Sequence, residues 1–499
     1  MKKPLSFIFL FIAGMLLAPG ANSQGNIDPK LYKASTIPDS LKTEANSVVR
    51  YSATSIVEKG PGKLVIDTHT IVTVLSEKGD KEAMMVLPYN KKYDTFSDIV
   101  MRVYNADGEV IKKYHKGDMY DGAADGGELV TDERFLGVRH VIASYPCTIE
   151  MEYEENLTSE LDLGQWTIQK NEQSVENAYY HIQIDSGAGF RYLNKNTGIK
   201  PQKKIIDHAE NYYWTVKNLK AFKLEEGAAS WRVLPHIYFA ANIFEFYGVR
   251  GSMASWSDFG SFIAGLNASV NSLSPAREAE IRAMTDTIKD DKKKAEFLYN
   301  YLQRNMRYVS VQLGIGGLKP FPASFVDQQK YGDCKALSNY MSALLKAVNI
   351  PSYYAVVNAE ANMEPADFSF PYNNFNHVIL CVPFKGDTTW LECTSNITRF
   401  GKLGPFTENR TALLISPDGG KLVNTPRSSM ADNQFNSEAH IVLDADGGAK
   451  TSVKILATGE YRYDYVNYEA MKSDEQKELY QRMLNIKQPS VFEVKAGTD

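Results

Sequence analysis

The stretch YGDCKALSNYMSALLKAV, residues 331–348, predicts a buried helix with a cysteine in its first turn. Its apolar residues recur at three- and four-residue spacing, which gathers them on a single face. Asp333 is a natural N-cap, and Pro351 marks the end of the helix. The thiol of Cys334 is therefore expected where free backbone N–H groups and the helix dipole favour a negative charge, as a nucleophilic thiolate requires.

Two residues that follow Cys334 can complete a thiol site. Catalysis by a thiolate needs an imidazole to pair with the sulfur and an acid to orient the ring. His377 opens a predicted strand in the same domain, and Glu392 lies on the next strand, across a turn centred near Lys385. The two side chains can then lie opposite each other on one face. Each residue also fits a structural role when taken singly, as buried filler, a strand-end polar group or a solvated acid.

The elements around this helix predict an α+β domain. Ser274-Pro275 is a helix start, with a capping residue before a proline at the first helical position. A second helix is predicted over about 295–306. Three strands are predicted after residue 348, at 353–357, 377–382 and 388–394, and the last two form a hairpin.

The segments on either side of this domain are rich in strand patterns. Successive hairpin signals run from about Val48 to Leu219 and predict an antiparallel β-sandwich. After Arg410, strands are predicted at 440–443 and 451–456 and a helix at 473–484, in a domain that looks incomplete. We therefore expect an α+β multidomain chain, divided into a signal peptide (1–23), an N-terminal β-sandwich (24–221), a connecting segment with short helices (222–273), the thiol domain (274–410) and an incomplete C-terminal β-rich domain (411–499).

Composition narrows the possible functions. The 499 residues exceed the size of one hydrophobic core, so several domains are expected. The formal charge of -5 and the lack of a dense Lys/Arg block argue against nucleic acid as a partner. The four cysteines form no CxxC pair and the eight histidines have no paired-ligand spacing, so neither a metal nor a cofactor is expected. Strand alternation places Cys381 and Cys393 on opposite faces, which argues against a disulfide between them, and Cys147 is expected to be buried filler.

The N-terminus has the pattern of a signal peptide. Lys2 and Lys3 precede an apolar run over 5–18, and Ala21-Asn22-Ser23 offers small residues for cleavage before Gln24. The alternative is a membrane anchor, but the apolar run is shorter than the ~20 residues that a spanning helix needs. We expect export to the periplasm or beyond, with no stable membrane insertion after cleavage.

From about Ala276 to Arg410 the chain resembles the transglutaminase-like superfamily, which has the papain-type thiol fold. The motifs that carry the resemblance are YVSVQLG (308–314), YGDCK (331–335), NHVIL (376–380) and WLECT (390–394). The segment before Phe222 is similar to a domain of unknown function that often precedes this core in exported bacterial proteins. The tail resembles the start of a usual C-terminal companion.

The resemblance implies that Cys334 attacks a carbonyl carbon, that His377 shuttles the proton and that Glu392 holds the imidazole. The family usually has Asp at the third position, one methylene shorter than Glu392. The backbone N–H of Cys334 would donate to the oxyanion. Gln312 is a second donor by analogy with papain-like enzymes, or else a structural residue, and Lys335 is expected to be solvated.

Two functions follow from these residues. The first is an exported cysteine enzyme, protease or acyltransferase, that acts on amide bonds of protein or peptide substrates through a thioester, by hydrolysis or by acyl transfer. The second is a cell-envelope binding or scaffolding protein that keeps the fold with little chemistry and has other envelope components as partners.

Overall fold

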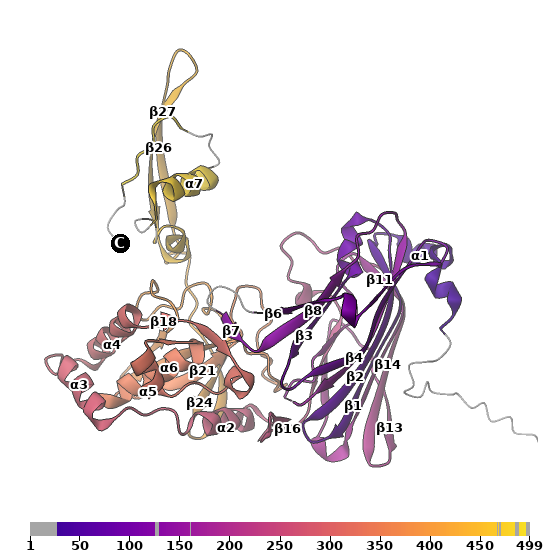
Figure 1. Ribbon diagram of the computed structural model, residues 1–499. Helices are drawn as coiled ribbons and strands as arrows, with labels where there is room; N and C mark the ends of the chain where they lie inside the picture. The colour runs from indigo at the N-terminus through magenta and orange to yellow at the C-terminus, as the bar shows by residue number, and fades with distance from the viewer. Residues whose placement is uncertain are drawn as a thin grey trace, which may run out of the picture.

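The computed structural model describes residues 27–124, 129–159, 161–466, 468, 471–484 and 489–495. A β-rich N-terminal domain lies beside an α+β domain, and a hairpin near the C-terminus extends away from both (Figure 1). The expected signal peptide lies outside the described residues. In the part of the chain that is described, no helix is both long and apolar enough to span a bilayer.

The N-terminal domain is a large sheet with two small sheets packed on it, so the predicted sandwich is confirmed. The large sheet has the order β13, β14, β11, β1, β2, β9, β4, β5, and in that order its strands are Gln202–Ile206, Ala209–Leu219, Gln173–Asp185, Ser47–Gly60, Lys63–Val74, Cys147–Leu157, Thr95–Tyr104 and Val110–His115. The small sheets are β3 (Met84–Asn90), β8 (Glu133–Arg139) and β6 (Tyr120–Ala123), and β10 (Gln165–Thr167), β15 (His236–Ala240) and β12 (Arg191–Lys195).

Pairing in the large sheet departs from the prediction at one place. β1 and β11 pair in parallel, whereas the other pairs of this sheet are antiparallel. The strands from β2 to β10 lie between β1 and β11 in the chain. A parallel pair requires a long connection of this kind. Short-range hairpin signals report only neighbouring strands, so this pair was not visible in the sequence.

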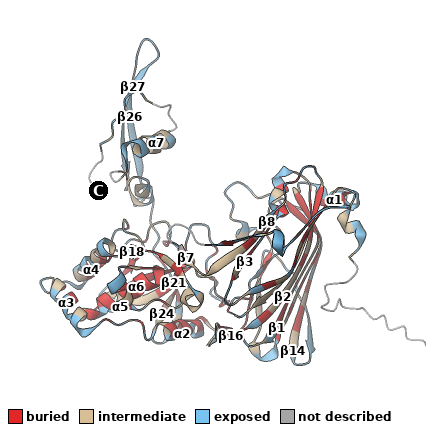
Figure 2. Cartoon of the chain, viewed as in Figure 1, coloured by how far each residue is buried: buried red, intermediate tan, exposed pale blue. Residues whose placement is uncertain are grey.

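The α+β domain has a five-stranded sheet covered on one face by two helices. α6 (Cys334–Ala347) packs on β22 through its apolar stripe, and α2 (Trp256–Asn267) packs on β24 and β25. Figure 2 shows that α6 and the strands beneath it are largely buried. The strands in sheet order are β23 (Asp387–Leu391), β22 (His377–Phe384), β21 (Tyr353–Val357), β24 (Thr411–Ser416) and β25 (Gly419–Asn424).

Two boundaries of this domain differ from those expected. β24 and β25 follow the expected end at Arg410, yet β24 pairs with β21 and so belongs to the core sheet. The expected connecting segment, 222–273, is divided, because β15 pairs with strands of the N-terminal domain while α2 covers the core sheet. Both differences arise from pairing between segments distant in sequence.

Three further helices pack around α6: α3 (Pro275–Thr285) begins at the predicted Pro275, α4 (Asp291–Asn305) begins four residues before the predicted 295, and α5 (Ala323–Gln329) was not predicted. The Ser274 hydroxyl accepts a hydrogen bond from the Arg277 N–H at 3.2 Å, so it caps the first of these helices. Short strands lie between them and beside α2 at β18 (Arg307–Tyr308), β19 (Ser310–Gln312), β20 (Tyr331–Gly332), β16 (Ile243–Phe246) and β17 (Val249–Ser252). The C-terminal region has a hairpin of β26 (Phe435–Leu443) and β27 (Ala449–Ala457), then α7 (Ser473–Leu484).

Candidate active site

Cys334 is the first residue of α6, and a polar cap fixes that end of the helix. Asp333 Oδ1 accepts a hydrogen bond from the Ala336 N–H at 2.8 Å. Its other oxygen lies 2.5 Å from Lys335 Nζ, and both side chains are buried. The expectation that Lys335 is solvated is therefore wrong. The ammonium offsets the negative charge of the cap, which would otherwise repel a thiolate on the neighbouring residue.

His377 and Glu392 form a buried pair at the other side of the site. His377 Nε2 lies 3.0 and 3.1 Å from the two carboxylate oxygens of Glu392. β23 ends at Leu391, which pairs with Leu380, so the continued register would place Glu392 beside Ile379 rather than directly opposite His377. The extra methylene of Glu lets the carboxylate reach along this diagonal, where an Asp at the same position would fall short.

Further hydrogen bonds hold the Glu392 carboxylate in place. Its Oε1 accepts from the Thr394 N–H at 3.1 Å and from the Thr394 hydroxyl at 2.6 Å. Its Oε2 accepts from the Thr407 hydroxyl at 3.2 Å. The Phe406 ring packs edge-on against the His377 ring, with centroids 5.0 Å apart. Both partners of the pair are thus fixed in orientation, as a group that orients an imidazole must be.

The charges in this pair support each other. Burial lowers the pKa of His377, but the charge of Glu392 and hydrogen bonds with Cys334 and Glu392 outweigh it and raise the pKa to about 10. Burial alone would raise the pKa of Glu392, yet the charge of His377 and hydrogen bonds from His377 and Thr394 hold it below its usual range. The imidazole is therefore a cation at neutral pH, with Nε2 facing the carboxylate and Nδ1 left for the sulfur.

One cavity brings together the residues that the sequence singled out. Cys334, His377 and Gln312 line a cavity of about 290 Å³. Glu392 lies behind His377 and is not among the lining residues. Apolar walls are formed by Phe259, Ile263, Leu318, Val356, Phe375 and Val378, and Lys335, Tyr354, Asn373 and Asn376 add polar groups to the lining. Such a mixture of apolar walls and a few convergent polar groups is typical of a small-ligand or side-chain pocket.

The N-terminal domain supports one wall of this cavity. β7 (Leu129–Thr131) pairs in parallel with β19, the strand that ends at Gln312 (Figure 1). The Thr131 hydroxyl donates to the Gln312 carbonyl at 3.1 Å, and the Gly314 N–H donates to Asp132 Oδ1 at 3.4 Å. A strand from a separate domain thus positions the segment that carries Gln312.

Comparisons with known proteins agree with the predicted family resemblance. Residues 279–395 match the profile of the Transglutaminase-like superfamily, and residues 61–223 match DUF3857, a domain of unknown function with a solved structure. Residues 279–395 are a transglutaminase-like core. The sequence matches no curated protein.

One solved structure has a similar overall fold. A Parabacteroides distasonis protein described as a “putative protease” has a TM-score of 0.59 and 12% identity, over 81% of this chain and 78% of that one. A “putative cysteine protease” from Cytophaga hutchinsonii covers 80% of this chain and 90% of its own at 11% identity, but its TM-score of 0.21 is too low to show a shared overall arrangement. The first likeness shows that most of this chain has a fold already seen in a solved structure.

Three residues near the transglutaminase-like core went unnoticed in the sequence: Thr394, Thr407 and Tyr354. Thr394 is the last residue of the WLECT motif and lies two positions after Glu392, so a local hydrogen bond to Glu392 could have been suspected. Tyr354 shares a strand face with Val356, which the two-residue alternation could have shown. No sequence signal brings Thr407 to the carboxylate, because the loop before β24 returns to the site only in the folded chain.

The four cysteines are free thiols with different surroundings. Cys381 and Cys393 pack into different clusters on opposite faces of the sheet, as predicted. Burial raises the pKa of Cys147 and of Cys381 to about 11, and it also raises the pKa of Cys393. These three thiols are therefore poor nucleophiles near neutral pH.

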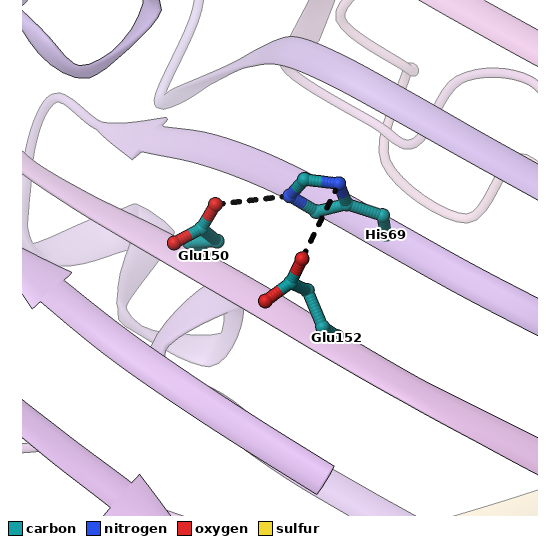
Figure 3. A group of neighbouring side chains, drawn as sticks. All are labelled: His69, Glu150 and Glu152. Carbon is teal, nitrogen blue, oxygen red and sulfur yellow. Dashed lines mark hydrogen bonds and ion pairs between the residues drawn. The ribbon is translucent and has the colours of Figure 1, made fainter. Parts of the chain in front are cut away.

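A group with the spacing of metal ligands lies on β2 and β9 of the large N-terminal sheet (Figure 3). Of the side chains described, His69, Glu150 and Glu152 are close enough together to hold an ion. Arg102 Nη1 lies 2.9 Å from Glu150 and 2.5 Å from Glu152, and His69 Nε2 lies 2.9 Å from Glu150. Tyr104 donates to Glu150 at 2.6 Å. The carboxylates already have cationic and hydroxyl partners, so this group is an ion-pair network within the sheet.

Proposed function

We propose that the chain is a transglutaminase-like cysteine enzyme that acts on amide bonds of protein or peptide substrates. The buried His377–Glu392 pair beside Cys334, at one cavity, is the observation that carries this proposal. Burying a charge is costly unless hydrogen bonds or an opposite charge compensate it. A site without catalytic activity would have no reason to keep a buried imidazolium beside a thiol at this cost. Here the partners of both charges are present.

The proposed reaction passes through a thioester. The Cys334 thiolate adds to the amide carbon, and the π electrons of the carbonyl move to its oxygen. The C–N bond then breaks, and His377 gives its proton to the departing amine. Water or a second amine attacks the thioester, loses a proton to His377 and releases Cys334. The first-turn N–H groups of α6 have no partner within the helix, so the Cys334 N–H can donate to the oxyanion, with Gln312 as a second donor.

The site of action that we propose is outside the cytoplasm. Its basis is the N-terminal pattern of two lysines, an apolar run and a small-residue cleavage site before Gln24. Export to the periplasm would place the site among proteins and peptides of the cell envelope, which are the substrate class proposed. Detection of a mature N-terminus at Gln24 in the exported fraction would support this location, and retention of the full chain in the cytoplasm would contradict it.

The enzyme proposal is tested by the reactivity of Cys334. The purified protein is treated with limiting iodoacetamide between pH 5 and 9, and each cysteine is quantified by peptide mapping. A free cysteine with a pKa of about 8.5 is less than about 1% ionised at pH 6. We expect Cys334 to react about 100-fold faster than such a thiol at pH 6, and His377→Ala to remove most of that advantage.

The other cysteines provide the control within the same sample. Cys147 and Cys381 should stay unlabelled at pH 6, because burial raises their pKa values to about 11. If Cys334 reacts no faster than a free thiol and His377→Ala changes nothing, the enzyme proposal fails. The envelope binding or scaffolding role would then be the better account of the fold.

A further inference from the structure

The hydroxyl group of Tyr354 is a buried polar group without a protein partner. Tyr354 lies on β21 and lines the same cavity as Cys334 and His377. Its oxygen is shielded from solvent and makes no hydrogen bond to any of the described residues. Buried hydroxyl groups in folded proteins almost always have a partner, so this one calls for an explanation.

A second group of the same kind faces the cavity. Asn373 lines it from the loop before β22, and its Oδ1 is also shielded and has no hydrogen-bond partner among the described residues. Two residues that line the cavity thus each have a polar atom without a partner among the described residues, an O–H donor on Tyr354 and a carbonyl acceptor on Asn373. A peptide bond offers the complementary pair, a C=O acceptor and an N–H donor. Both groups would be satisfied by a bound peptide segment.

The state of the Tyr354 hydroxyl suits a donor. Burial, together with the charges of Cys334 and Asp333, raises the pKa of Tyr354 well above its normal value. The group therefore keeps its proton near neutral pH. It can donate a hydrogen bond but cannot act as a base, because burial, with a smaller effect of the nearby negative charges, raises its pKa and so favours its O–H form.

We infer that Tyr354 is a catalytic residue whose hydroxyl donates a hydrogen bond to the carbonyl oxygen of the scissile amide, next to the N–H of Cys334. This inference rests on the proposed function. As the Cys334 sulfur bonds to the carbonyl carbon, the carbonyl π electrons become a lone pair on oxygen, and the Tyr354 O–H stabilises that charge without losing its proton. When the C–N bond breaks, the electrons return to reform the carbonyl of the thioester, and the amine leaves with the proton of His377.

The rest of the cavity indicates the kind of residue that carries this carbonyl. Phe259, Ile263, Leu318 and Phe375 line it, so it fits an apolar side chain. A short peptide aldehyde that ends in phenylalaninal is therefore the probe. Addition of the Cys334 thiol to the aldehyde gives a hemithioacetal, with a C–S bond and an oxygen where the oxyanion of an amide substrate would lie.

The test compares Tyr354→Phe with Tyr353→Phe, its neighbour on the same strand. Tyr353 packs on the opposite face of the sheet and so serves as the matched control. Tyr354→Phe removes only a hydroxyl that has no protein partner, so its Tm should be equal to or higher than that of the wild type. We expect its affinity for the peptide aldehyde to fall about 100-fold and that of Tyr353→Phe to stay within threefold.

Alkylation by iodoacetamide separates this role from a structural one. The sulfur attacks a CH₂ group in that reaction and no oxyanion forms, so Tyr354→Phe should react with Cys334 at the wild-type rate. The inference is overturned if aldehyde affinity changes less than threefold, or if alkylation falls as much as aldehyde binding does. A wild-type protein that does not bind the aldehyde would overturn the proposed function as well, whereas wild-type binding that Tyr354→Phe retains would overturn this inference alone.

Discussion

Replacing Glu392 by Gln removes the charge that faces His377 and keeps the shape of the side chain. Moving the pKa of an imidazole from about 6.5 to about 10 corresponds to about 5 kcal/mol in favour of the cation. Loss of a neighbouring opposite charge lowers such a pKa by about 1–3. We therefore expect His377 to titrate near 8 in Glu392→Gln. An NMR pH titration of protein labelled at its histidine rings measures this directly, and His377→Ala assigns the signal.

The same substitution should change how stability depends on pH. Because the pKa of His377 is higher in the folded than in the unfolded protein, its contribution is full below about pH 6.5 and is lost as the pH rises through about 10. Urea unfolding should show Glu392→Gln less stable than the wild type by about 3 kcal/mol at pH 6, with the difference shrinking toward pH 10. Glu296→Gln, at an exposed position on α4, is the control.

One outcome would refute this account of the pair. If His377 of Glu392→Gln still titrates near 10, and its stability follows the wild-type pH curve, the carboxylate does not hold the imidazolium. The buried hydrogen bonds of Thr394 and Thr407 would then serve only to satisfy a structural acid.

Two further predictions concern the segment that carries Gln312 and the ion-pair network of the N-terminal sheet. Gly314 has φ of +50°, and a Cβ there would lie 2.8 Å from the Tyr93 ring. Gly314→Ala should therefore lower the free energy of unfolding by at least about 1–2 kcal/mol and slow the alkylation of Cys334. Gly316→Ala is the control and should do neither, because a Cβ at Gly316 would meet no atom of the described residues within 4 Å. Burial alone would raise the pKa of Glu150, but hydrogen bonds from its partners lower it to about 2. Its contribution is therefore present above about pH 4.5 and lost as the pH falls through about 2, and acid unfolding of Glu150→Gln should show a shallower pH dependence than that of the wild type.

Local signals in the sequence predicted the centre of the site. Capping by Asp333 and the apolar stripe of α6 depend on residues within a few positions of one another, so they were readable directly. The turn between β22 and β23 brought His377 and Glu392 to neighbouring strands for the same reason. The membership of β24 in the core sheet was not predicted, because its partner β21 lies more than fifty residues earlier and no local pattern records the pairing.

The roles of individual polar groups were harder to predict. Lys335 was predicted to be a solvated first-turn residue. Its side chain is instead buried and paired with the buried carboxylate of Asp333, and this burial depends on the packing of the folded domain. The hydroxyl of Tyr354 lacks a partner because, in the described part of the folded chain, no donor or acceptor lies in hydrogen-bonding position beside it. The sequence alone does not show this. A sequence states which donors and acceptors exist, whereas only the fold decides which remain unpaired.

The pairing of β7 with β19 bears on the order in which the protein matures. Residues 129–131 leave the ribosome long before residues 310–312, and N-terminal domains generally fold first during synthesis. The folded N-terminal domain can then act as a template, because β7 is already in place for β19 to pair with it. A chain cut to its thiol domain would lose that template, so reactivity of the cysteine would report that both domains have folded and docked.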